Sequence, residues 1–320
     1  MSSTAGRITL WGVEVFVATA EEGAISAAAK RLGTSPATVS QQLTRLESAM
    51  GVGLLNRATR PVSLTSAGEI FLRRANVILN EAEQARAELA SNDLSRLRRF
   101  RLGMIEDFDA DVTPGLLSVM AEELRHCQFL LETGASHRLD DLLESRALDV
   151  IVAAGAKEAA PGIEHHLLLE EPFIVAAPKG AIGGGDAAAQ LRKLPLIQYT
   201  TRHKMGRIIA AHLDSQNLVL THRFELDSYH AIMAMVAEGV GWTILTPLGW
   251  LRAQRFRDQV DVMPMPFVPL SRVISLHARA GMLGDMPARM AEHIRPLLRQ
   301  HVIAPALAVH PWLEPELKVL

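Results

Sequence analysis

The sequence predicts an α+β multidomain protein, in which a small N-terminal winged helix-turn-helix is followed by a long linker helix and a C-terminal α/β domain. Three observations predict this organisation. Two short helical patterns flank a tight turn at Gly33, an apolar heptad pattern follows residue 65, and strand and helix patterns alternate after residue 100. The chain has 320 residues, 48% of them hydrophobic, which is enough for two or three compact cores.

The first 33 residues predict two helices and a turn. An apolar stripe at helical spacing runs from residue 13 to 20, and Gly23 ends that helix. Ser26 is expected to cap a second helix over residues 27–32, because its hydroxyl can accept from a backbone N–H of the first turn. Gly33 then supplies the tight turn that leads into the third helix.

The third helix carries the strongest local signal. Ser35 is a suitable N-cap, Pro36 fits the first helical position, and the helix is expected to end near Met50. Its apolar stripe, spaced by 4, 3 and 4 residues, is Val39, Leu43, Leu46 and Met50. We expect this stripe to face a core and the opposite face to meet solvent or a ligand.

That opposite face carries short or amide-bearing side chains, which let a helix approach the major groove of DNA closely. Glutamine can pair with the adenine edge, serine and threonine reach bases or phosphates, and arginine reaches guanine or phosphate. The candidate DNA-binding residues are Ser35, Pro36, Ala37, Thr38, Ser40, Gln41, Thr44 and Arg45 on the helix, with Arg57 and Arg60 after it. The alternative is an ordinary solvated helix face.

The segment 54–64 is typical of two short strands around a basic tip, where Arg57 and Arg60 would meet the DNA backbone or the minor groove. Residues 26–65 hold five basic side chains and one acidic one, whereas the whole chain carries a net charge of −2. A basic segment on an acidic remainder is typical of a modular DNA-binding protein.

A long helix is predicted from residue 66 to about residue 90. Ser66 and Glu69 have the spacing of a capping box. The residues that form the heptad seam are Phe71, Ala75, Ile78, Ala82, Ala85 and Leu89. This seam predicts pairing with a second copy, which would set two recognition helices about 34 Å apart on DNA. The alternative is packing of the helix on its own domain.

The N-terminal block resembles the LysR-type transcriptional regulators. The matching segments are 16–18 (FVA), 25–32 (ISAAAKRL), 34–43 (TSPATVSQQL), 45–47 (RLE), 51–57 (GVGLLNR) and 64–68 (LTSAG). Many members have proline at the position of Ala37 and a basic residue at that of Gln41, and Asn56 stands where Phe or Glu is common. The resemblance implies sequence-specific binding of double-stranded promoter DNA, a homodimer that assembles into a homotetramer, and contact with RNA polymerase.

The remaining chain predicts a doubly wound α/β domain. Strand patterns at 100–105, 128–132 and 150–153 alternate with helical patterns, and a second set of strands and helices lies between 196 and 238. The resemblance, carried here by 139–150, 171–178 and 238–247, implies a periplasmic-binding-protein-like effector domain of two subdomains. The expected domains are 1–65, 66–92 for the linker helix, 98–302 for the effector domain (subdomain I 98–171 and 272–302, subdomain II 172–271), and a surface or loose tail, 303–320.

A small-molecule effector of unknown identity is expected where strands of such a fold end, between the subdomains. The candidate effector-binding residues are Glu106, Asp107, Phe108, Thr133, Ser136, Tyr199, Thr200, Thr201, Arg202, Asp227, Gly241 and Trp242. The acidic run at 106–111 suggests a cationic effector stacked on Trp242 or Phe108. A solvated acidic loop is the alternative, and Arg202 leaves an anionic effector open.

Other functional classes find little support. No nucleophile-elbow, phosphate-loop or metalloprotease motif occurs, so we expect no enzyme, no cofactor and no metal. The pairs His126-Cys127 and His165-His166 lack the spacing of a structural zinc site. One cysteine and no apolar run of 18 residues predict a cytoplasmic protein without a membrane segment. The main alternative is a small-molecule-binding module without DNA activity.

Overall fold

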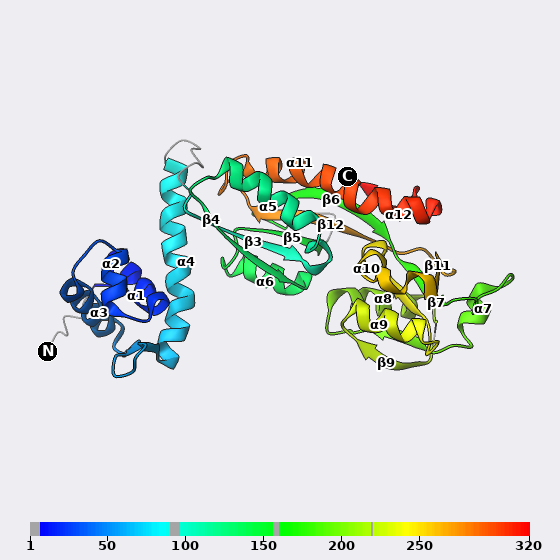
Figure 1. Ribbon diagram of the computed structural model, residues 1–320, viewed down its shortest axis with the longest axis horizontal. Coiled ribbons are helices and arrows are strands. Elements are labelled where there is room, and N and C mark those ends of the chain that lie inside the picture. Colours follow the sequence, from blue (N-terminus) through cyan, green and yellow to red (C-terminus); the bar gives the residue numbers. More distant parts are fainter. Residues whose placement is uncertain (1–6, 90–96, 156–159, 219) are drawn as a thin grey trace. The chain divides into compact units, whose positions relative to one another are not determined.

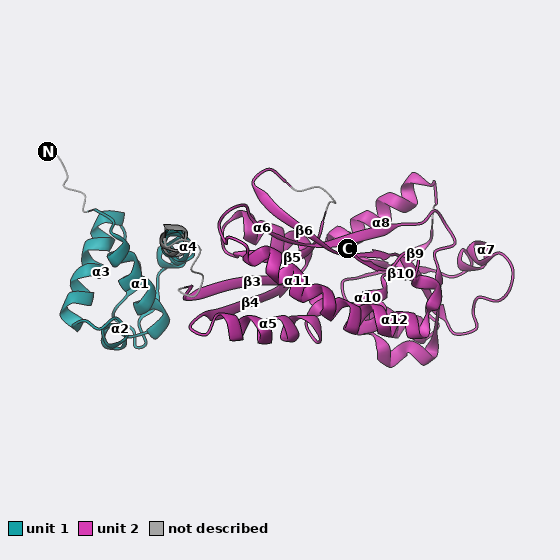
Figure 2. Ribbon diagram, turned by 90° about the horizontal axis from the view of Figure 1, so that it is seen from above, with its two compact units in different colours: residues 1–93 teal, residues 94–320 magenta. Residues whose placement is uncertain are grey.

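The computed structural model describes residues 7–89, 97–155, 160–218 and 220–320. The chain forms two compact units, residues 1–93 and 94–320, coloured teal and magenta in Figure 2. Each has its own buried core.

Unit 1 is a helical domain with a small β-ribbon. Its elements are α1 (Leu10–Glu22), α2 (Ile25–Arg31), α3 (Pro36–Met50), β1 (Leu55–Asn56), β2 (Ser63–Leu64) and α4 (Ser66–Leu89). Strands β1 and β2 pair antiparallel and form the wing. The rings of Phe16 in α1 and Phe71 in α4 meet edge to face, 5.1 Å between centroids, so the long helix begins as part of this core.

Two helix starts differ from the predictions. Helix α2 begins at Ile25 after Ala24, which makes no side-chain capping bond, so the prediction that Ser26 caps it is wrong. The cap of α4 is Thr65, whose Oγ1 accepts from Gly68 N at 3.0 Å, and Ser66 is already helical. The adjacent residues Thr65 and Ser66 can each cap the helix, and the spacing to Glu69 alone did not decide between them.

The heptad seam of α4 divides between two environments. Phe71 and Ala75 are buried in the core of unit 1, as the alternative of self-packing requires. Farther along, Ile78 is 38% exposed and Ala85 is exposed. The side chain of Leu89 and residues 90–92 of the predicted linker lie outside the described part of the chain.

The first lobe of unit 2 is built on a six-stranded sheet in the order β13-β6-β12-β5-β3-β4. Its strands are β3 (Arg99–Ile105), β4 (Gln128–Gly134), β5 (Val150–Gly155), β6 (Ile163–Pro172), β12 (Ser271–Arg279) and β13 (Lys318–Val319). Strand β3 runs parallel to β4 and β5, whereas β12 runs antiparallel to β5 and β6. The helices of this lobe are η2 (Glu106–Phe108), α5 (Val112–Glu123), α6 (Ser136–Glu144) and α11 (Met286–Leu298).

The second lobe holds two smaller sheets, visible with their helices in Figure 1. The strands are β7 (Ile174–Pro178), β8 (Leu196–Tyr199), β9 (His222–Leu226), β10 (Thr243–Leu245) and β11 (Val260–Pro264). The helices are α7 (Ala187–Leu191), α8 (Lys204–Ser215), α9 (Tyr229–Ala237), α10 (Pro247–Arg252) and η3 (Gln254–Gln259). The chain enters this lobe between β6 and β7 and leaves it between β11 and β12.

The last residues are ordered rather than loose. Helix α11 continues through η4 (Arg299–Ile303) into α12 (Ala304–Val309), followed by η5 (Pro311–Leu313) and the edge strand β13. Leu313 and Leu317 are buried, which explains why this segment holds a defined path. In the part of the chain that the structure describes, no helix has the length and apolar character needed to cross a membrane.

Candidate functional site

Helix α3 has the predicted orientation. Val39 and Leu43 are fully buried and Leu46 is 2% exposed, whereas Gln41, Thr44 and Arg45 face solvent. Ser35 caps the helix by accepting from Thr38 N at 3.1 Å, and Pro36 stands at its start. A polar helix face therefore stands free on the surface of unit 1, with its apolar stripe in the core.

Not every side chain of that face is free. Thr44 Oγ1 donates to Ser40 O at 3.0 Å, and the hydroxyls of Ser35 and Thr38 lie 2.8 Å apart. Ser35, Pro36 and Ala37 are exposed, whereas Thr38 and Ser40 are half-buried. Gln41 and Arg45 are therefore the longest exposed side chains among the candidates on α3.

The wing is fastened to α3 by one carboxylate. Glu47 Oε1 accepts from the backbone N–H groups of Leu54 at 2.8 Å and Leu55 at 3.1 Å. Its other oxygen pairs with the guanidinium of Arg57, which also donates to Thr44 Oγ1 at 3.3 Å. Arg57 is thus half-buried at the base of the wing rather than free at its tip, while Arg60 is exposed.

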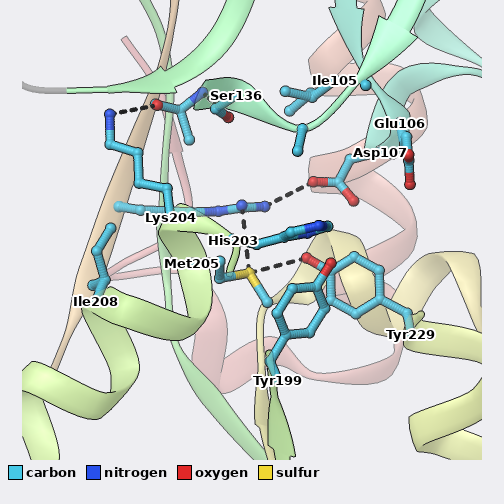
Figure 3. A pocket seen from close by; sticks show the side chains of 14 residues that line it. Ile105, Glu106, Asp107, Ser136, Tyr199, His203, Lys204, Met205, Ile208 and Tyr229 are labelled. Atoms are coloured by element: carbon cyan, nitrogen blue, oxygen red, sulfur yellow. Dashed lines mark hydrogen bonds and ion pairs between the residues drawn. The ribbon is translucent and has the colours of Figure 1, made fainter. Parts of the chain in front are cut away.

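A cavity of about 60 Å³ lies between the two lobes of unit 2 (Figure 3). It lies at the carboxyl ends of β3, β4, β5 and β8, where ligand sites of open α/β sheets occur. Its lining residues are Ile105, Glu106, Asp107, Gly134, Ala135, Ser136, Ala154, Tyr199, His203, Lys204, Met205, Ile208, Tyr229 and Arg272.

A buried ion-pair network lies at one side of this cavity. The guanidinium of Arg272 lies 2.9 Å from Asp107 Oδ2 and 2.7 Å from Glu171 Oε1, and all three side chains are under a tenth exposed. Burial raises the pKa of Glu171, against the lowering effect of Arg272. Asp107 therefore has a cationic partner within the protein, which it shares with Glu171.

Two helix starts and a lysine bring positive charge to the cavity. Ser136 begins α6 and Lys204 begins α8, and neither helix has a side-chain N-cap. The Lys204 ammonium donates to Ala154 O at 3.2 Å and lies 4.0 Å from Asp140. Helix N-termini attract negative charge, so the cavity wall formed by these two helices favours an anionic group.

Aromatic rings line another part of the cavity. Tyr199 lies 5.3 Å from Tyr229 and 5.8 Å from His203 between ring centroids. Burial raises the pKa of both tyrosines, so both phenols stay protonated at neutral pH. Tyr229 donates to Met205 Sδ at 3.1 Å, which holds the ring and the thioether together (Figure 3).

Four of the predicted effector residues, Glu106, Asp107, Ser136 and Tyr199, line this cavity. The residues that do not line it are Phe108, Thr133, Thr200, Thr201, Arg202, Asp227, Gly241 and Trp242. Thr200 and Thr201 bind Glu225, and Arg202 donates to Thr200 Oγ1. These contacts fix the turn after β8 instead of leaving its hydroxyls for a ligand.

The predicted stacking residues belong to the core. Phe108 is 1% exposed, and Trp242 is fully buried with Nε1 donating to Leu194 O at 3.2 Å. A Cβ on Gly241 would lie 2.2 Å from Pro195 O, so this glycine permits close backbone packing rather than ligand contact. The idea that Trp242 or Phe108 stacks on a cationic effector is therefore wrong.

The lining residues that the sequence prediction missed include His203, Lys204, Met205, Ile208, Tyr229 and Arg272. Lys204 and Tyr229 open helices that follow strands, and the rule that helix N-termini face the crevice would have identified them. Arg272 had no such signal, because a basic residue at the start of an apolar strand also fits an exposed strand end. Within the described ranges, no three His, Cys, Asp or Glu side chains gather to hold a metal ion.

A winged helix-turn-helix joined to a two-lobed α/β domain with an interlobe cavity defines a ligand-responsive transcription regulator. Residues 10–69 match the bacterial regulatory helix-turn-helix protein, lysR family, and residues 95–301 match the LysR substrate binding domain. The chain belongs to the LysR family, which consists of transcription regulators and not enzymes.

The relatives and solved structures agree with this assignment. A Mycobacterium leprae protein named probable hydrogen peroxide-inducible genes activator is 33% identical over 63% of this chain and 66% of its own length, so the chain spans just under two thirds of that relative. The dual regulator OxyR of Escherichia coli K12 is 28% identical over 90% of this chain and 95% of its own. The structure of a Corynebacterium glutamicum OxyR C206 mutant is 25% identical, with a TM-score of 0.63, and covers 95% of this chain and 96% of that one.

Proposed function

We propose that this LysR-family regulator binds double-stranded promoter DNA through the exposed face of α3 and the wing. The observation that carries the proposal is the orientation of α3, with Val39 and Leu43 buried and Gln41 and Arg45 exposed. Arg45 and Arg60 make no ion pair among the described residues, so both are available to phosphate or guanine.

The test is a gel-shift titration with the DNA upstream of the gene that encodes the chain. Binding through several basic residues has a steep salt dependence, and Arg60→Ala lowers affinity for all sequences alike with a shallower salt slope. Gln41→Ala instead changes which bases are preferred, whereas Glu14→Ala, exposed on α1 and outside the candidate DNA-binding residues, serves as the control. Absence of salt-dependent binding would favour a small-molecule-binding module without DNA activity.

We propose further that the regulator works as a homodimer that assembles into a homotetramer and contacts RNA polymerase. Ile70 and Ile78 on α4 are 59% and 38% exposed, an apolar surface that a second α4 would cover. Sedimentation analysis of Ile78→Glu tests the pairing, because a charge in a helix seam weakens association. An unchanged oligomeric state in this variant would show that the dimer contact does not involve Ile78.

The effector that we propose is a small molecule with an anionic group and an apolar body, bound in the interlobe cavity. Arg272 pairs with Asp107 and Glu171, and Lys204 and two helix starts offer positive charge to an anion. Tyr199, Met205 and Ile208 offer apolar surface to the rest of the molecule. A cationic effector would depend on the acidic lining residues Glu106 and Asp107. Asp107 already pairs with Arg272, which leaves Glu106.

A thermal-shift panel of small carboxylates and amines tests the charge of the effector. Carboxylates are expected to stabilise unit 2, and Lys204→Met is expected to remove the effect, whereas Lys193→Met, an exposed lysine outside the cavity, retains it. Stabilisation by amines alone would contradict the proposal.

The proposed effector is a bound molecule rather than a disulfide-forming oxidant. The 320 residues contain one cysteine, so an intrachain disulfide cannot form. Burial raises the pKa of Cys127 to about 11, which disfavours the reactive thiolate. The peroxide response in the names of several relatives is therefore not carried over to this chain.

A further inference from the structure

Residues 304–320, called the strap below, extend beyond the region that matches the family. The match to the LysR substrate binding domain ends at residue 301. The strap nevertheless contributes fully buried side chains to the core of unit 2, Ala306 and Leu313, together with Leu317 at 3% exposure. It is an integral part of this domain.

Both ends of the strap are attached to the first lobe. At its beginning it continues from α11, which packs on α5 and β6. At its end, Lys318 and Val319 pair with Glu170 and Leu169 of β6, and Leu320 N donates to Leu168 O at 3.0 Å. Arg295 of α11 closes the loop by donating Nε–H to Leu320 O at 2.6 Å and Nη2–H to Leu167 O at 3.0 Å.

The middle of the strap contacts the second lobe. The His310 ring meets the ring of Trp250 in α10 edge to face, 4.7 Å between centroids, and Trp312 lies 5.7 Å from His310. Trp250 is 3% exposed and Trp312 is 36% exposed, so the stack is covered at its inner end. Nε2 of His310 is buried without a hydrogen-bond partner among the described residues, and burial lowers its pKa, so the ring acts by packing as a neutral aromatic.

Helix α10 connects this stack to the interlobe cavity. Leu248 N donates to Glu171 Oε2 at 3.2 Å, which joins α10 to the buried ion-pair network at the crossover between the lobes. A Cβ on Gly249 would lie 2.5 Å from a ring atom of Tyr229, so α10 is in close contact with a cavity residue. One short helix thus touches both the wall of the cavity and the strap.

We propose that the strap is an intramolecular clamp that fixes the angle between the two lobes and sets how readily the cavity closes. Attached to the first lobe at both ends, it holds the second lobe through the stack of His310 on Trp250. When a ligand enters the cavity and displaces Tyr229, α10 is displaced with it, because Gly249 packs on Tyr229. The displacement of α10 changes the contact between Trp250 and His310 of the strap. The link to an effector rests on the proposed function, whereas the clamp itself does not.

The test measures the distance between the lobes by pulsed electron spin resonance in the full chain. With Cys127→Ser as background, spin labels at Glu144→Cys on α6 and Ala211→Cys on α8, both exposed positions, report across the cleft. Dilution with unlabelled protein removes distances between subunits. His310→Ala is expected to shift the ratio of lobe arrangements about 3- to 10-fold, as the loss of one aromatic pair implies.

Three further variants separate a clamp from a merely stabilising segment. Deletion of 318–320 releases the strap from β6 and is expected to broaden the same distance distribution. His310→Phe keeps the ring and is expected to restore the wild-type distribution, and the exposed Glu314→Ala is the control. Variants that melt at a lower temperature but keep the wild-type distribution would overturn the proposal, as would equal distributions for His310→Ala and His310→Phe. If His310→Ala shifts the distance distribution but carboxylates have no effect on the wild-type protein, the clamp proposal is supported and only the proposed anionic effector is rejected.

Discussion

Removal of the Arg272 guanidinium tests the buried ion-pair network beside the cavity of unit 2. The variant Arg272→Met leaves Asp107 and Glu171 buried without their partner, and loss of one member of a buried pair costs about 3–5 kcal/mol of unfolding free energy. The cost depends on pH. Because Arg272 lowers the pKa of Glu171 against the effect of burial, the variant raises that pKa further.

A carboxyl group with a raised pKa in the folded state supports folding while it is protonated, and this support is lost as the pH rises through that pKa. The variant is therefore expected to be more destabilised at about pH 8 than at about pH 5.

Urea unfolding followed by tryptophan fluorescence measures this difference, because three of the four tryptophans lie in unit 2. The matched control is Arg138→Met, whose arginine is 64% exposed and pairs with Glu132. Exposed pairs contribute only about 0–1 kcal/mol. Equal destabilisation of Arg272→Met at both pH values, or a loss no larger than that of the control, would refute the reasoning.

Three other outcomes follow from the packing and charges of the chain. Leu43→Ala, at a fully buried position of α3, is expected to lower the stability of unit 1 by about 2–5 kcal/mol in urea unfolding, whereas Gln41→Ala changes it little. Burial, together with the neighbouring His165, lowers the pKa of His277 to about 4, so the free energy of unfolding is expected to fall as the pH decreases from 6.5 toward 4. His277→Phe should make the free energy of unfolding less dependent on pH in this range. An unchanged dependence in the variant would contradict this role of His277. Glu47→Gln loosens the wing and is expected to weaken binding to every DNA sequence alike in gel shifts, while a change of base preference would contradict this role.

The sequence predicted those features that depend on local pattern. The stripe that begins at Val39, the cap Ser35 and the turn at Gly33 depend on neighbouring residues, and unit 1 formed as expected around them. The cap Ser66 was misplaced by one residue because Thr65 beside it competed for the helix start, and the cap Ser26 by two because α2 begins after Ala24 without a side-chain cap.

The cavity was predicted less completely because long-range pairing determines it. Glu106 and Tyr199 follow or end strands, so a rule about strand ends identified them. Trp242 lies directly before β10 rather than after a strand, and it turns inward, where its indole N–H donates to Leu194 O. Arg272 reaches the cavity from 165 residues beyond Asp107, and no pattern in a single sequence reveals such a pair.

The carboxylate of Glu47 has a consequence for the proposed binding of operators by α3 and the wing. By binding two wing amides and Arg57, it makes the wing and the recognition helix one preorganised body. Such a body loses little conformational entropy on docking and cannot reshape itself to suit a poor site. A mismatched operator must then be accommodated by deformation of the DNA, so the sequence-dependent stiffness of the duplex becomes part of the recognition code.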